Sequence, residues 1–173
     1  MIFMSQSGIT DCTRFGDWAQ WYFEHLRIMA TVPGVYSAQR FTTTHPDHPP
    51  SLAMYGVASA AVFKGDYYQS VRGMGEWLPL IDRQWYRRNL FAGLDVAPVV
   101  GEGEVLIVAD RDAPDNALAL PFAWLAVAGI DRSTPYRGIV VVRENVAQAL
   151  PDNVACYVPA SRRYINSSEE NRI

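Results

Sequence analysis

The chemistry that this sequence could support centres on one histidine in the segment DWAQWYFEHLRIMATVPG, residues 17–34. Five residues recur at spacings of three and four, which is the repeat of one face of a helix: Trp18, Tyr22, His25, Met29 and Val32. The polar residues of the segment fall at other positions, so His25 is predicted to face a sheet rather than solvent. A buried imidazole needs a hydrogen-bond partner, because an unpaired buried polar group costs about 1–3 kcal/mol.

Two interpretations of His25 remain open at this point. It is either a packing histidine in the core or a general acid or base beside a cavity, since histidine titrates near neutral pH. Tyr55 and Arg40 fall on predicted neighbouring strands and could share that cavity. The tyrosine would donate to a developing oxyanion and the arginine would hold a carboxylate, whereas the simpler alternatives are a core tyrosine and an edge ion pair.

Aromatic residues near these positions could form the wall of a pocket for an aromatic substrate, or could simply fill the core. The candidate substrate-binding residues are Trp21, Tyr22, Tyr68, Trp77 and Trp85. The basic segment RQWYRR at 83–88 is predicted to be a solvated helix face, with attraction of an acidic substrate as the alternative.

The elements that must position these residues follow from periodicity and from turn signals. Strands are predicted at 1–5, 35–41 and 52–57, and a helix from Thr13 or Arg14 to Thr31, ended by Pro33-Gly34. Helices are predicted from Ser59 to about Tyr68 and at 77–88, before a returning strand. This order, β-α-β-β-α-(α)-β, predicts an α+β fold with a ferredoxin-like antiparallel sheet and helices on one face.

The second half of the chain reads as a shortened repeat of the first. Strands are predicted at 104–110, 136–143 and 153–159, with a helix at 115–129 that Pro121 would kink and a helical turn at 144–150. A chance likeness of two β-α-β units is the alternative. The predicted domains are a ferredoxin-like module at 1–98, a second, degenerate module at 99–165 and a polar tail at 166–173.

The N-terminal half resembles the dimeric α/β-barrel superfamily, including its EthD-like group, over roughly residues 1–95. The likeness lies in the segment PPSLAMYGVAS and in a set of matching positions: Trp21, Tyr22, Glu24, His25, Leu26, Val32, Pro33, Gly34, Ala38, Arg40 and Phe41. The resemblance implies a homodimer whose two sheets pack face to face, with a pocket between each sheet and its helices. Members include isomerases, cyclases, lyases, cofactor-free monooxygenases and haem-handling proteins, and the helix histidine borders the pocket in some of them.

Together these observations predict a small enzyme without a cofactor that acts on a hydrophobic, cyclic or aromatic oxygenated metabolite. His25 would move a proton in cyclisation, isomerisation or lyase chemistry, and Tyr55 and Arg40 would polarise a carbonyl or enolate. The alternatives are a non-catalytic binding or structural barrel dimer and, less favoured, a haem protein with His25 as the iron ligand.

Composition excludes several other classes of function. The 173 residues carry a net charge of −3 without a basic stripe, which argues against nucleic acid as a partner. Cys12 and Cys156 form no cluster, and His45 and His48 lack the further ligands of a metal site, so no metal is predicted. Without a signal peptide or a membrane-length apolar run, the chain is predicted to be cytoplasmic and not bound to a membrane.

Overall fold

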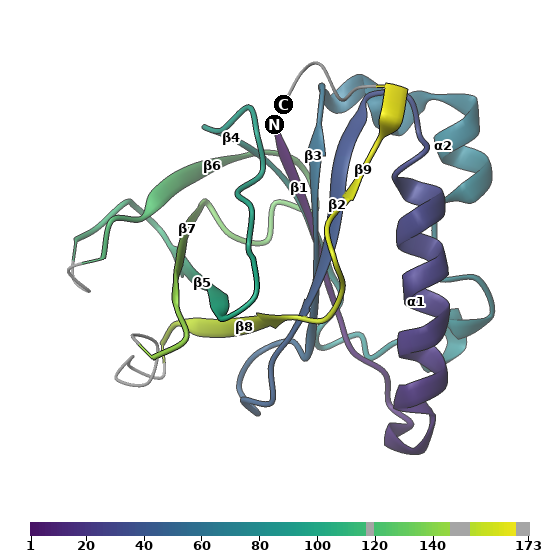
Figure 1. Ribbon diagram of the computed structural model, residues 1–173, viewed down its shortest axis with the longest axis horizontal. Coiled ribbons are helices and arrows are strands. Elements are labelled where there is room, and N and C mark those ends of the chain that lie inside the picture. Colours follow the sequence, from purple (N-terminus) through teal and green to yellow (C-terminus); the bar gives the residue numbers. More distant parts are fainter. Residues whose placement is uncertain (117–119, 146–152, 169–173) are drawn as a thin grey trace.

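Eight antiparallel strands close into a barrel, and one long helix packs on the outside of one wall (Figure 1). The computed structural model describes residues 1–116, 120–145 and 153–168. Neighbouring strands around the barrel follow the order β3-β1-β4-β6-β7-β5-β8-β2, and pairing of β2 with β3 completes the ring. The strands are β1 Ile2–Ser7, β2 Val35–Thr42, β3 Ser51–Val57, β4 Arg87–Ala92, β5 Glu104–Arg111, β6 Ala123–Ile130, β7 Tyr136–Arg143, β8 Ala155–Pro159 and the short β9 Tyr164–Ile165.

The helices gather on one side of the barrel, against the wall made by β1, β2, β3 and β4 (Figure 1). They are α1 Phe15–Met29, α2 Asp66–Val71 and three short 3-10 segments, η1 Cys12–Arg14, η2 Ala60–Lys64 and η3 Gly75–Leu80. Asp11 caps the first segment by accepting from the Thr13 backbone N–H at 3.0 Å. Gly34, at φ 81°, supplies the left-handed conformation in which the chain turns from α1 toward β2.

Alternation along the wall strands divides their side chains between two cores. On β1, Phe3 packs toward α1, whereas Ile2 and Met4 point into the barrel. The barrel interior is filled by aliphatic and aromatic side chains from all eight strands, as expected for a barrel of this strand number. The largest fully buried side chains of the barrel interior include Phe41, Leu52, Met54, Phe91 and Tyr157, together with one charged side chain, Arg137.

One chain supplies both the wall and the strands that cover it, and this overturns the ferredoxin-like prediction. The sheet does not end at β4: it continues through β6, β7, β5 and β8 and returns to β2, where Phe41 pairs with Pro159 and Thr42 with Val158. A closed, mostly β barrel therefore replaces the α+β sandwich, and the degenerate second module is equally wrong. The resemblance to the dimeric α/β-barrel and EthD-like proteins is not supported, so the isomerase, lyase and homodimer expectations that rested on it lose their basis.

The predicted helix at 115–129 is wrong within the described residues. From Ala123 to Ile130 the chain forms β6, which pairs with β4 on one side and β7 on the other. The segment is rich in alanine and leucine, which favour helices, but it has no polar face. The prediction for 144–150 falls mainly on residues outside the described part of the chain.

The predicted helix at 77–88 is also wrong. A 3-10 segment containing Pro79 ends at Leu80, a turn follows, and β4 begins at Arg87. The strand alternates, with Leu90 facing the helices and Phe91 facing the barrel interior. This correction matters for function, because it moves Arg88 from a helix surface onto the sheet wall.

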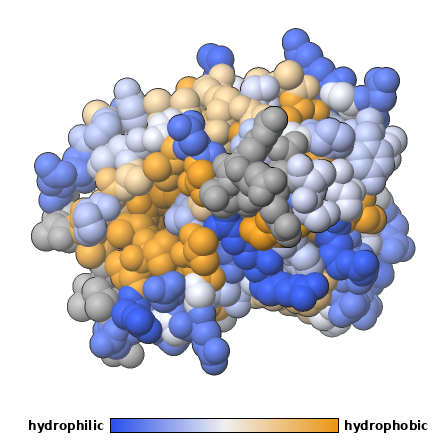
Figure 2. All heavy atoms as spheres, turned by 45° about the horizontal axis from the view of Figure 1, so that its top comes forward, coloured by the Kyte–Doolittle hydropathy of each residue, from blue (hydrophilic) through white to orange (hydrophobic). Residues whose placement is uncertain are grey.

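The two halves of the molecule present different surfaces. The outer face of β6 and β7 carries partly buried Phe122, Trp124, Val140 and Val142, and Figure 2 shows apolar atoms gathered over that half of the molecule.

None of the helices in the described residues is both long and apolar enough to cross a membrane.

Candidate functional site

A cavity of about 530 Å³ lies between α1, the sheet wall, α2 and the loop at 72–75. Its volume is in the range of sites that hold small organic molecules. The residues that line it are Phe3, Ser5, Tyr22, His25, Met29, Tyr55, Tyr68, Gln69, Arg72, Gly73, Met74, Gly75, Leu78, Tyr86 and Arg88. The first helix, two central strands and β4 therefore all contribute side chains to one hollow.

His25 lines this cavity from the middle of α1. Its ring stacks on Trp21, with ring centroids 4.9 Å apart and planes 10° apart. Within the described residues the imidazole has no hydrogen-bond partner, and no acidic side chain pairs with it. Burial lowers the pKa of His25 to about 4, so the ring is neutral at pH 7 and one nitrogen is an acceptor.

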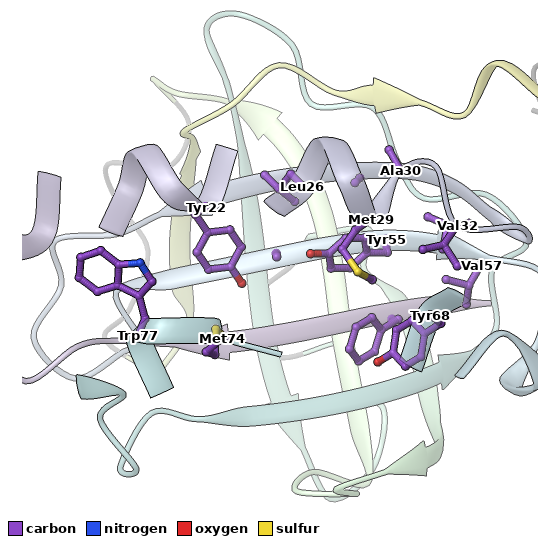
Figure 3. Close-up of a cluster of buried hydrophobic side chains, with 14 of the residues drawn as sticks. Tyr22, Leu26, Met29, Ala30, Val32, Tyr55, Val57, Tyr68, Met74 and Trp77 are labelled. Atoms are coloured by element: carbon purple, nitrogen blue, oxygen red, sulfur yellow. The ribbon is translucent and has the colours of Figure 1, made fainter. Parts of the chain in front are cut away.

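Three tyrosines place phenol groups around the same hollow. Tyr22 and Tyr55 are almost completely buried, and their hydroxyl groups point toward one another in Figure 3. Burial raises the pKa of Tyr22, Tyr55 and Tyr68 above the usual tyrosine value, so each keeps its proton and is a donor at pH 7. In the described part of the chain, the hydroxyls of Tyr55 and Tyr68 have no hydrogen-bond partner.

Arg40 does not line the cavity but lies beneath it. Its guanidinium carbon is 4.9 Å from the ring centroid of Trp18 and 4.6 Å from that of Tyr22. Its Nε donates to Ser51 Oγ at 2.9 Å, and no carboxylate among the described residues pairs with it. The structure thus brings His25 and Tyr55 together in the cavity and leaves Arg40 as a buried cation under Tyr22.

The predicted substrate-binding aromatics divide into three groups. Tyr22 and Tyr68 line the cavity, and Trp21 lies behind it as the stacking partner of His25. Trp77 is buried with only 2% exposed, and the Arg14 guanidinium lies 4.4 Å from its ring. Trp85 lies elsewhere, in a depression of about 320 Å³ at one mouth of the barrel.

Arg72, Tyr86 and Arg88 also line the cavity. Arg72 had no predicted role, whereas Tyr86 and Arg88 belong to RQWYRR, which was predicted to be a solvated helix face or, as the alternative, to attract an acidic substrate. No periodic pattern could have revealed Arg88, because RRNLFA at 87–92 has three polar residues followed by three apolar ones rather than the alternation of a half-buried strand. The loop between α2 and η3 depends on two glycines, since Gly73 and Gly75 adopt φ values of 102° and 50°.

The described residues contain no cluster of three or more His, Cys, Asp or Glu side chains that could hold a metal ion. The rings of His45 and His48 lie 4.9 Å apart in the loop between β2 and β3, outside this cavity. No protein-family model and no curated protein matches the sequence.

The low pKa of His25 predicts a specific loss of stability in acid. Between about pH 6.5 and pH 4 the unfolded chain binds a proton at His25 that the folded chain does not, so the free energy of unfolding must fall as the pH is lowered through this range. The shift corresponds to a loss of about 3 kcal/mol at pH 4 or below. Urea unfolding at a series of pH values should show this loss in the wild type and not in His25→Phe.

The His45→Gln variant is the matched control, since it removes a histidine outside the cavity. The chain has three histidines, so the His25 ring signal in an NMR spectrum can be assigned by its loss in His25→Phe, and its titration gives the pKa directly. A His25 midpoint near 6.5 would contradict the prediction.

Proposed function

We propose that this protein binds a flat, partly apolar small molecule that carries a hydroxyl or enol group, in the cavity beside His25. One observation supports this proposal best. The neutral His25 ring, which is a hydrogen-bond acceptor, lines the same cavity as the Tyr55 and Tyr68 hydroxyls, which are donors without a partner among the described residues. His25 accepts from the ligand hydroxyl, and Tyr55 or Tyr68 donates to a second oxygen. Phe3 and Met29 supply apolar contact area.

A hydroxyl-bearing ligand suits His25 because the ring is held neutral. An imidazolium would be a donor only, whereas the neutral ring accepts a hydrogen bond at one nitrogen. The stack on Trp21 fixes the plane of the ring, so less rotational freedom is lost when a ligand binds. A cytoplasmic location is part of the same proposal.

Matched naphthalene compounds test this proposal. 2-Naphthol can donate to His25, whereas 2-methoxynaphthalene has a similar shape without the donor. We expect wild-type protein to bind the naphthol about tenfold more tightly, as one net hydrogen bond allows. Titration of each compound into the protein, followed at the His25 ring signal by NMR, gives both the affinity and the location.

His25→Phe keeps a ring to stack on Trp21 but removes the acceptor, so it should bind both compounds equally when the two affinities are measured by titration calorimetry. The His45→Gln variant should retain the wild-type preference. Equal binding of the two compounds to wild-type protein would contradict the role of His25, and no shift of its signal with either compound would contradict the binding site itself.

A second candidate function is acid–base catalysis at the same site, without a cofactor. The observation that favours it is that His25 and Tyr55 line one cavity as a neutral base and a protonated phenol. His25 would accept a proton from the bound enol or from a carbon beside a carbonyl, and Tyr55 would donate to the oxygen that gains negative charge. Exchange of a ligand carbon-bound hydrogen for deuterium in heavy water, lost in His25→Phe, would distinguish catalysis from binding.

A further inference from the structure

The cations at the rim distinguish this cavity from the rest of the molecule. The chain as a whole has a net charge of −3, yet the charged residues that line the cavity are Arg72 and Arg88. Within the described part of the chain, no Asp or Glu lines it. Asp131 pairs with Arg88, so the charge of Arg72 is the part of this excess that no described residue balances.

The two arginines share the cavity with one phenol. Arg72, Arg88 and Tyr68 all line it, and both cations oppose the rise in the Tyr68 pKa that burial causes. Arg72 follows the last turn of α2 and forms no ion pair with any described residue. The Tyr68 hydroxyl and the two arginines therefore line one cavity together.

Arg88 is held in place with hydrogen-bonding capacity left over. Its Nη2 lies 3.2 Å from Asp131 Oδ1, and its guanidinium carbon lies 5.3 Å from the ring centroid of Tyr86. Its Nε is buried and has no hydrogen-bond partner among the described residues. Because this Nε is enclosed by protein, a ligand would meet the guanidinium at Nη1, which also has no partner among the described residues.

We propose that the ligand of this cavity carries a carboxylate, which binds between Arg72, Arg88 and the Tyr68 hydroxyl while its ring system extends toward His25. This inference rests on the proposed function, and it adds the charge class of the ligand and its orientation. Arginine suits the role because its planar donor groups match the two oxygens of a carboxylate. The ligand class is thus a flat aromatic or cyclic carboxylic acid that also bears a hydroxyl or enol group.

Two isosteric probes separate charge from shape. 2-Naphthoate and 2-naphthamide have the same ring and nearly the same outline, but only the naphthoate is charged at pH 7. Wild-type protein should bind the naphthoate at least about tenfold more tightly at low ionic strength, as expected for charge-assisted hydrogen bonds. The preference should shrink as salt is raised from roughly 20 mM to roughly 300 mM.

Charge-removing variants locate the effect. Arg72→Gln and Arg88→Gln should each reduce naphthoate affinity by about three- to tenfold and leave naphthamide affinity unchanged. Arg72→Gln is the safer variant for folding, because Arg72 is exposed and forms no ion pair among the described residues. Arg83→Gln removes the same charge from the exposed turn before β4, outside the cavity, and should leave both affinities at wild-type values.

The outcomes separate the two proposals. If both probes shift the His25 signal with equal affinity, the carboxylate site is wrong and the binding cavity stands. If neither probe shifts it, and neither does 2-naphthol, both proposals are wrong. A naphthoate preference that survives in Arg72→Gln and in Arg88→Gln would place the anion elsewhere and overturn this inference.

Discussion

Replacing Trp18 by alanine should remove about 3–5 kcal/mol from the free energy of unfolding, the loss typical of a large buried side chain. Trp18 has no exposed surface. Its ring packs edge-on against Phe15 and Tyr22, with ring centroids 5.4 and 5.5 Å apart. It also lies against the Arg40 guanidinium, so alanine would leave a cavity and uncover a buried charge together. Urea unfolding followed by circular dichroism measures the loss.

Phe15→Ala is the control for this prediction. Phe15 belongs to the same helix and contacts the same indole, but 37% of it is exposed. Its truncation should cost roughly 1 kcal/mol or less, which is normal for a partly exposed site. Equal losses in the two variants would show that Trp18 does not anchor α1 to the barrel wall.

The second large effect is expected inside the barrel, at Arg137. Its guanidinium has no exposed surface, and its Nε and Nη2 each lie 2.7 Å from an oxygen of Asp110. Nη2 also donates to Gln6 Oε1 at 2.8 Å, which links β7 and β5 to β1 across the interior. Arg137→Ala should cost about 3 kcal/mol, because it empties an enclosed volume and leaves the buried Gln6 Oε1 without its donor, whereas the Asp110 carboxylate, 43% exposed, is hydrated. Thermal and urea unfolding should agree on this value.

Arg27→Ala isolates the effect of burial. Arg27 Nη1 also lies 2.7 Å from a carboxylate, that of Glu24, but both side chains are more than half exposed. Such a pair contributes about 0.5 kcal/mol or less. A further variant, Arg137→Met, keeps much of the volume without the charge and should be more stable than Arg137→Ala. Similar stabilities for Arg137→Ala and Arg27→Ala would contradict the proposed role of the interior network.

The elements of the first half were accessible from local pattern. The stripe that includes Trp18, Tyr22 and Met29 predicts a helix from Thr13 or Arg14 to Thr31, and the structure has α1 at Phe15–Met29 with these three residues buried. Val35–Thr42 and Ser51–Val57 form strands close to the predicted ranges. In each case the period of apolar residues and the flanking turn residues agree, so local sequence determines the element.

The architecture was not accessible in the same way. Closure depends on the pairing of Phe41 with Pro159, and neither residue carries a local sign of the other. The segment at 123–130 has residues that favour a helix, yet in the structure its two neighbouring strands β4 and β7 supply hydrogen-bond partners that override that preference. Long-range pairing, rather than propensity, decides the fold of the second half.

The candidate site was predictable only where one helix face defined it. His25 and Tyr22 share the stripe on α1, and both line the cavity. Arg72 and Arg88 come from a helix end and a strand that meet only in the folded chain. Arg72 follows Tyr68 by four residues at the end of α2, but the approach of Arg88 to Tyr68 could not be read from spacing, because it joins α2 to a strand that follows later in the chain.

The wall made by β1, β2, β3 and β4 has one hydrophobic core on each side, and this has a consequence for how the protein can change over evolutionary time. On β1 and β3, odd-numbered positions such as Phe3 and Tyr55 belong to the helix side, and even-numbered positions such as Met4 and Met54 belong to the barrel interior. Substitutions at the odd positions can therefore alter the lining of the cavity while the even positions preserve the scaffold. An insertion of one residue within either strand would exchange the two sets and damage both at once.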